Sequence, residues 1–112
     1  MLKIAFDKIF KHPLEKNHRF PMVKYELLPE QLLSEGTCST NNFFSPTDID
    51  EKVILETHSS KYYQRLTNFQ LDKKELRAIG FPMSDVLIER EKKIVQGTLE
   101  CSLHALKNGV SM

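Results

Sequence analysis

The hydrophobic pattern of the chain begins with a short apolar run and ends with a long helical stripe. Residues 2–6 are apolar apart from one lysine, too few for an independent helix, and they predict a strand. Residues 84–108 instead carry apolar side chains at helical spacing, start at Ser84 and stop before Gly109, so they predict one long helix. At roughly 1.5 Å per residue this helix is about 37 Å long, and it spans a compact domain or reaches past it.

Several residues of the predicted long helix, most of them apolar or small, lie near one line, which we expect to face the core. The line consists of Ile88, Glu91, Val95, Thr98, Ser102 and Ala105, and it is broadened by Leu87, Ile94, Leu99, Leu103 and Leu106. Cys101 lies on the same side of the helix. We interpret it as a small buried hydrophobic residue rather than as a nucleophile.

Proline, glycine and capping residues indicate shorter helices between these two elements. Pro21 suits the first position of a helix because its missing N–H would be unpaired there, and Pro29 predicts a kink or a restart of that helix. Residues 49–55 predict a second helix, with a strand at 53–55 as the less favoured alternative. The other signals that we expect to bound helices are Gly36, Thr47 or Asp48, Ser59 or Ser60, Asp72 and Gly80.

The order of these elements predicts the class of fold. Residues 37–47 are polar and predict a loop anchored by Phe43 and Phe44, whereas residues 110–112 resume an apolar pattern that suits a strand. A strand, then helices, then a second strand is typical of an α/β unit with a parallel sheet. Parallel sheets need several strands, so we expect residues 1–112 to be a single, mostly helical and incomplete segment with no second domain. The alternative is a self-contained helical domain with one N-terminal strand.

Composition narrows the class of protein without indicating a function. The 112 residues suffice for one domain, and a formal net charge of +1 gives no reason to expect nucleic acid or a membrane as a partner. No run approaches the ~20 apolar residues of a membrane span or resembles the apolar part of a signal peptide. Cys38 and Cys101 are the only cysteines and are most simply reduced, which predicts a cytoplasmic protein.

The loop at 12–22 carries the densest group of candidate functional residues. It holds His12, His18, Arg19 and two prolines. A zinc site needs three or four converging ligands. His12 and His18 have no cysteine or carboxylate motif beside them, and the other two histidines lie on a long helix and at a helix boundary, so we predict no metal site within these residues. Arg19 offers five donors in a rigid fork, which suits either binding of a carboxylate or bracing of the loop by hydrogen bonds.

Several stretches, in matching order, resemble one protein family. They are His12-Pro13 followed by residues 18–22, the run 53–66 with apolar residues before a histidine and two tyrosines, residues 79–82, and the long helix with Gly97-Thr98. Over nearly the whole chain they resemble the N-terminal third of the histone deacetylase superfamily, most closely its class IV and bacterial members.

This resemblance implies an arginase/deacetylase-type α/β fold, with a central parallel sheet and helices on both faces. It implies a zinc-dependent amide hydrolase that removes acetyl or longer acyl groups from lysine or a similar amine. By position, Arg19 matches an arginine that lines the channel below the active site, and His18, Phe20 and Pro21 lie near the wall of the acyl tunnel. The rim aspartate with which many members hold the substrate backbone has no counterpart at residues 79–82.

The same resemblance places the metal ligands and the catalytic residues after Met112. We therefore expect Zn²⁺ in the full-length protein but none bound by this segment, which should be inactive alone. Its expected partners are the remainder of the deacetylase domain, or a second copy through an exposed strand edge or an apolar helix face. The alternative, from a different class, is a small non-enzymatic helical interaction module.

Overall fold

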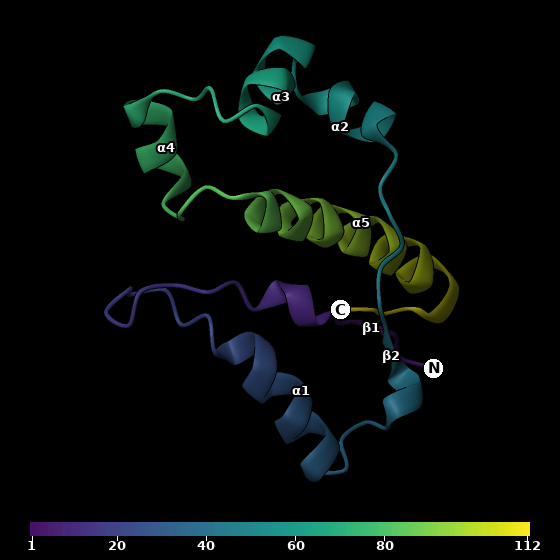
Figure 1. Cartoon of the computed structure of the whole chain (residues 1–112). Coiled ribbons are helices and arrows are strands. Elements are labelled where there is room, and N and C mark those ends of the chain that lie inside the picture. The colour runs from purple at the N-terminus through teal and green to yellow at the C-terminus, as the bar shows by residue number, and fades with distance from the viewer.

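The computed structural model describes residues 1–112 as a flat, mostly helical molecule that measures 45 × 36 × 17 Å. Its helices are α1 (Lys24–Ser34), α2 (Glu51–Thr57), α3 (Ser60–Thr67), α4 (Lys73–Ile79) and α5 (Asp85–Asn108), with 3-10 helices η1 (Lys8–Phe10) and η2 (Thr40–Asn42) and strands β1 (Ile4–Ala5) and β2 (Phe43–Phe44). Figure 1 shows α5 crossing the middle of the molecule, with α2, α3 and α4 on one side and the sheet and α1 on the other.

The sheet is small and parallel, and β1 is its central strand. β1 pairs with β2 in the register Ile4 to Phe43 and Ala5 to Phe44. At its other edge a parallel bridge joins Lys3 to Ser111, and the N–H of Ala5 donates to the carbonyl of Met112 at 2.6 Å. The strand predicted at the C-terminal end therefore lies beside β1 as a single bridge.

The prediction of a loop anchor at Phe43 and Phe44 was wrong, because these residues form β2. A backbone N–H or C=O group buried without a partner is costly, and the backbone of β1 finds its partners in this segment. Phenylalanine also suits a half-buried pleated surface. In the sequence this strand is only two aromatic residues among polar ones. So short a run does not distinguish a strand from an anchored loop.

Most of the predicted helix boundaries are confirmed. Asp72 accepts a hydrogen bond from the N–H of Glu75, whose side chain accepts one from the N–H of Asp72, so α4 begins with a capping box. The caps that agree with the sequence are Ser59, Asp72 and Ser84 at helix starts and Gly36, Gly80 and Gly109 after helix ends. Gly80 and Gly109 have φ of +78° and +90°, which favours glycine.

Two helix starts differ from the prediction. Asp50 caps α2, where its carboxylate accepts from the N–H of Lys52 at 3.0 Å. Thr47 does not cap a helix because its N–H and its hydroxyl both donate to Glu100 on α5. The first helix begins at Lys24 rather than at Pro21.

The predicted restart at Pro29 was wrong, because α1 is one helix that contains this proline. Proline removes one hydrogen bond, to the carbonyl four residues earlier at Tyr25. No residue of α1 is buried, so water can satisfy that carbonyl. An exposed helix therefore tolerates this residue better than a helix in a core would.

The side of α5 that faces the core agrees with the prediction at Leu87 and Ile88 but differs from it further along the helix. Its buried residues are Leu87, Ile88, Arg90 and Gly97, whereas Val95, Leu99, Leu103 and Leu106 are exposed. A Cβ atom at Gly97 would lie 3.0 Å from Cγ of Pro46 and 3.5 Å from Cβ of Ala5, so this glycine permits α5 to approach the sheet closely. In this part of α5 the side with the small residue Gly97 therefore faces the sheet, and the neighbouring side with the leucines stays exposed.

The predicted length of the last helix is confirmed. α5 has 24 residues, or about 36 Å, against a longest dimension of 45 Å. No helix of the chain combines the length and the apolar character that a membrane span requires. α5 is long enough, but charged residues recur along it.

Candidate functional site

Arg90 is the central polar residue of the folded chain. It lies on α5 and is only 3% exposed. Its Nε donates to the carbonyl of Phe10 at 2.7 Å, and its guanidinium also donates to Glu91 and to the sulfur of Met22. One side chain thus ties α5 to the end of η1 and to the residues that lead into α1.

Aromatic rings enclose the guanidinium of Arg90. Its central carbon lies 5.2 Å from the ring centre of Tyr25 and 5.9 Å from that of Phe81. Phe20 packs edge-to-face against Phe81 at 5.2 Å and stacks with Tyr25 at 6.4 Å. Attraction of a cation to ring faces is strongest where water is excluded, so this cluster fixes the loop at 12–22 against α5.

His18 fastens the same loop to the connection between α4 and α5. The N–H of Phe20 donates to Nδ1 of His18 at 3.1 Å, so the proton of the neutral ring is on Nε2. Nε2 then donates to the carbonyl of Gly80 at 3.1 Å. Because both ring nitrogens are engaged, His18 is a bracing residue and is not available as a metal ligand.

His12 is the second buried histidine of the loop region. It is 4% exposed, and its Nδ1 has no hydrogen-bond partner. Burial lowers the pKa of His12, the charge of Arg90 lowers it further, and Glu91 and the carbonyl of Pro82 act in the opposite direction. His12 is therefore neutral at pH 7, and protonation would place a second positive charge beside Arg90.

The four candidate residues of the channel and the acyl tunnel, Arg19 and its neighbours His18, Phe20 and Pro21, divide into two pairs. His18 and Phe20 pack into the structure, whereas Arg19 and Pro21 are exposed. Arg19 makes no hydrogen bond or ion pair within the chain, so bracing of the loop by Arg19 is wrong. Its five donors are available to an anionic ligand, while its neighbours hold the backbone in place.

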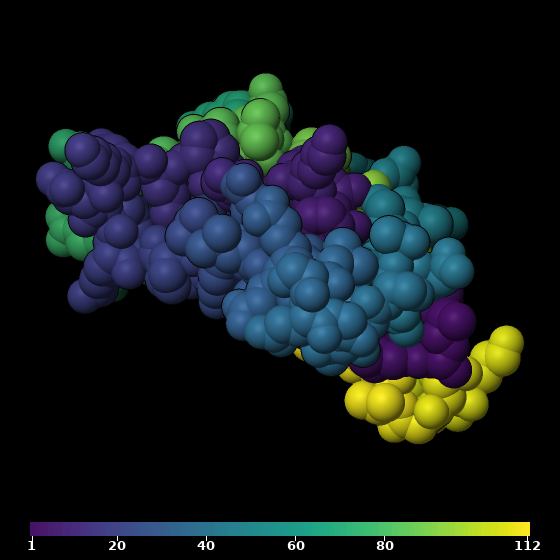
Figure 2. Space-filling model, turned by 90° about the horizontal axis from the view of Figure 1, so that it is seen from below, coloured from purple at the N-terminus to yellow at the C-terminus, as the bar shows by residue number.

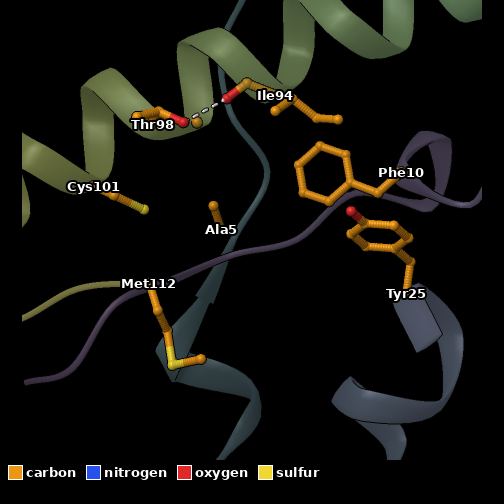
Figure 3. A pocket seen from close by; sticks show the side chains of 8 residues that line it. Ala5, Phe10, Tyr25, Ile94, Thr98, Cys101 and Met112 are labelled. Atoms are coloured by element: carbon orange, nitrogen blue, oxygen red, sulfur yellow. Dashed lines mark hydrogen bonds between the residues drawn. The ribbon is translucent and has the colours of Figure 1, made fainter.

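An apolar cavity of about 250 Å³ lies on the other side of the aromatic cluster. Its lining residues are Ala5, Phe10, Tyr25, Ile94, Gly97, Thr98, Cys101 and Met112. In Figure 3, Phe10 and Tyr25 form one end of this cavity, and Cys101 and Met112 lie at the other. The hydroxyl of Thr98 already donates to the carbonyl of Ile94 at 3.1 Å, so the lining suits an apolar group rather than a charged one.

The histidines do not gather at one point. His58 packs against Tyr62 with ring centres 5.7 Å apart, and His104 packs edge-to-face against Phe44 at 5.0 Å. No three His, Cys, Asp or Glu side chains come together in a way that would hold a metal ion. The side chains of this segment therefore do not fit a zinc site by themselves.

Arg90 is the central residue of the candidate site, and the sequence analysis missed it. It lies three residues after Leu87 and four before Ile94, which is the spacing of the buried side of α5. A charged residue at such a position is a signal for a paired, buried charge. The line chosen from the sequence instead ran through Glu91, which is exposed.

Comparisons with known proteins give one informative match. No protein-family model matches the chain. An uncharacterized protein of Picosynechococcus sp. is 30% identical over 108 residues, which cover 96% of this chain and 36% of the relative. The chain thus spans about a third of the length of the relative it matches.

Proposed function

We propose that the chain is the N-terminal segment of a zinc-dependent, histone deacetylase-like amide hydrolase, which removes acetyl or longer acyl groups from lysine or a similar amine. The observation that carries this proposal is the meeting of segments that resemble that family. The loop at 12–22, residues 79–82 and α5 converge on Arg90 and His18, although the hydrogen-bonded residues of these segments lie 62 to 68 positions apart in the sequence.

In this proposal Arg19 forms part of the wall of the acyl channel. Its guanidinium is exposed, and a planar fork of donors binds a carboxylate such as acetate with two parallel hydrogen bonds. His18 and Phe20 hold the backbone on either side of it. Pro21 limits the freedom of the chain immediately after it.

The zinc ion and its ligands belong to other parts of the proposed full-length protein. When bound, such an ion polarises the acyl carbonyl and activates a water molecule. The residues described here bind and orient the acyl group and supply one wall. We propose no catalytic step for this segment, and no turnover by it alone.

The proposed partner is the remainder of the deacetylase domain. Support comes from the relative, of which the matching segment is only about a third, and from the sheet, whose outer edges are unpaired. Further parallel strands would pair with those edges, and apolar side chains would fill the cavity beside Met112. We place the protein in the cytoplasm, where Cys38 and Cys101 stay reduced.

The test is zinc-dependent release of acetate from acetyl-lysine peptides. The enzymes are the full-length Picosynechococcus relative and a chimera in which this chain replaces the matching segment of the relative. We expect both to be active, and Arg19→Ala in the chimera to lower the rate by about tenfold or more, because a hydrogen bond to a charged group is lost. Lys16→Ala, in the same exposed loop, is the matched control and should leave the rate unchanged.

The proposal fails if neither protein releases acetate or a longer acyl group from lysine peptides or polyamines. The alternative, a non-enzymatic helical interaction module, is favoured by one observation: four large apolar side chains stay exposed in a row on α5. An inactive relative together with specific binding through those side chains would support this alternative.

A further inference from the structure

The chain exposes more surface than a compact protein of its mass. A folded monomer of 13.0 kDa exposes about 6,300 Å². This chain exposes 8117 Å² and buries only 11 of its 112 residues. The excess of about 1,800 Å² is more than the roughly 800 Å² that each partner contributes to a stable protein interface.

The most continuous exposed apolar surface is one side of the C-terminal half of α5. We call it the α5 stripe, and it consists of Val95, Leu99, Leu103 and Leu106, which are 45, 39, 68 and 86% exposed. These residues follow one another at helical spacing, and the first three form a ridge at every fourth position. Figure 2 shows the end of this helix, with the residues that follow it, standing out at one edge of the molecule.

Polar groups beside the α5 stripe are already satisfied within the helix. The hydroxyl of Ser102 donates to the carbonyl of Thr98 at 2.9 Å, and that of Thr98 donates to the carbonyl of Ile94 at 3.1 Å. Covering these two residues therefore leaves no donor unpaired. The surface is thus prepared for burial against another apolar surface.

We propose that a second copy of this chain covers the α5 stripe, through antiparallel packing of the two α5 helices about a two-fold axis. A ridge at every fourth position packs into the matching groove of an identical helix, and two-fold symmetry lets one patch serve both partners. The formal net charge of +1 opposes this pairing very little. The excess surface is large enough for such an interface, which does not depend on the proposed enzymatic function.

The experiment is sedimentation velocity and light scattering on the 112-residue chain over a range of concentrations. We expect one species of twice the 13.0 kDa chain mass, which dissociates on dilution. A monomer at every concentration overturns the proposal, and so does a series of larger aggregates without a discrete dimer.

Variants identify the surface. Leu103→Glu keeps good helix propensity, lies at an exposed position, and should weaken the dimer at least about tenfold. Ser102→Arg adds a charge beside the stripe without removing an apolar side chain and should do the same. Leu28→Glu, at another exposed leucine on α1, is the matched control and should leave dimerisation unchanged.

Circular dichroism shows whether each variant is folded. If Leu103→Glu unfolds, Ser102→Arg decides the question alone. A dimer that survives both stripe variants, or that is lost in Leu28→Glu instead, overturns the assignment of this surface.

Discussion

Around Arg90 the N-terminal half of α5 is enclosed by η1, the loop at 12–22 and the aromatic rings of Tyr25 and Phe81, whereas its C-terminal half leaves Leu103 and Leu106 in solvent. The enclosed half buries Arg90 together with Leu87 and Ile88, whereas the open half leaves Leu99, Leu103 and Leu106 exposed. Hydrophobicity alone therefore does not decide which part of a helix is buried. A donor that satisfies several segments at once organises this core more than the leucine-rich turns do.

The largest loss of stability is expected from a substitution at Arg90, in the centre of the enclosed half of α5. Arg90→Ala removes the donor to the carbonyl of Phe10 and the cation between two rings, and leaves a void. We expect a loss of about 3 kcal/mol in the free energy of unfolding, measured by urea denaturation followed by circular dichroism. Arg77→Ala, at an exposed position on α4, should change it by less than about 0.5 kcal/mol. Equal effects of the two variants would contradict the central role of Arg90.

A second prediction compares the two sides of α5 directly. Gly97→Val places atoms where Pro46 and Ala5 already lie, so we expect a destabilisation of about 2 kcal/mol from overpacking. Leu103→Ala on the open side removes side-chain atoms that lie in solvent, and it should cost less than about 0.5 kcal/mol in a monomer at high dilution. Urea denaturation of both variants at low concentration checks the order, and the reverse order would show that the open side is packed.

The third prediction concerns pH and His12. The pKa of His12 is lowered in the folded chain, so the unfolded chain binds the proton more readily. Stability should therefore fall as the pH drops below about 7, through the unfolded pKa near 6.5 and down to the lowered folded value. His12→Gln should flatten this part of the stability profile, measured by thermal unfolding between pH 7.5 and 5. An unchanged slope in that variant would mean that another group titrates there.

The smallest effect is expected at the surface between the loop region and α1. Lys11 and Glu26 form an exposed ion pair, about half of each side chain being accessible to solvent. Glu26→Gln should change stability by less than about 0.5 kcal/mol, and the change should vanish in 0.5 M salt because the charges are screened. Urea denaturation of both proteins at low and high salt measures this change in stability. A loss of stability as large as that of Arg90→Ala would show that this ion pair is important for folding.

Local signals in the sequence predicted local structure well. Asp72 and Ser84 mark helix starts, and Gly109 marks a helix end. Each acts through a hydrogen bond or a backbone angle within a few residues, so the local sequence is enough to recognise it. The restart predicted at Pro29 was wrong because the effect of a proline depends on whether the helix is buried, which is a property of the whole molecule. β2 was missed because its partner strand lies 39 residues earlier in the chain.

In the candidate site, too, the sequence indicated the local features but not the long-range contacts. The loop at 12–22 was visible as a dense cluster of histidine, arginine and proline, and His18 does brace that loop. Arg90 contacts this loop through its hydrogen bond to Met22, 68 residues away in the sequence, and only the tertiary structure shows that contact. The assignment of the loop to a deacetylase stays a prediction.

The position of β1 between its two neighbours has a consequence for how the chain is made. β1 is synthesised before both of its partners. It can pair with β2 once about 40 further residues have been made, but it can pair with Ser111 only after the 108 residues that follow Lys3 have been made. At roughly 5–20 residues per second, its second edge stays unpaired for several seconds after the first has closed. During that interval a neighbouring nascent chain can take the place of residues 110–112, so the order of synthesis itself selects when this protein is most exposed to mispairing.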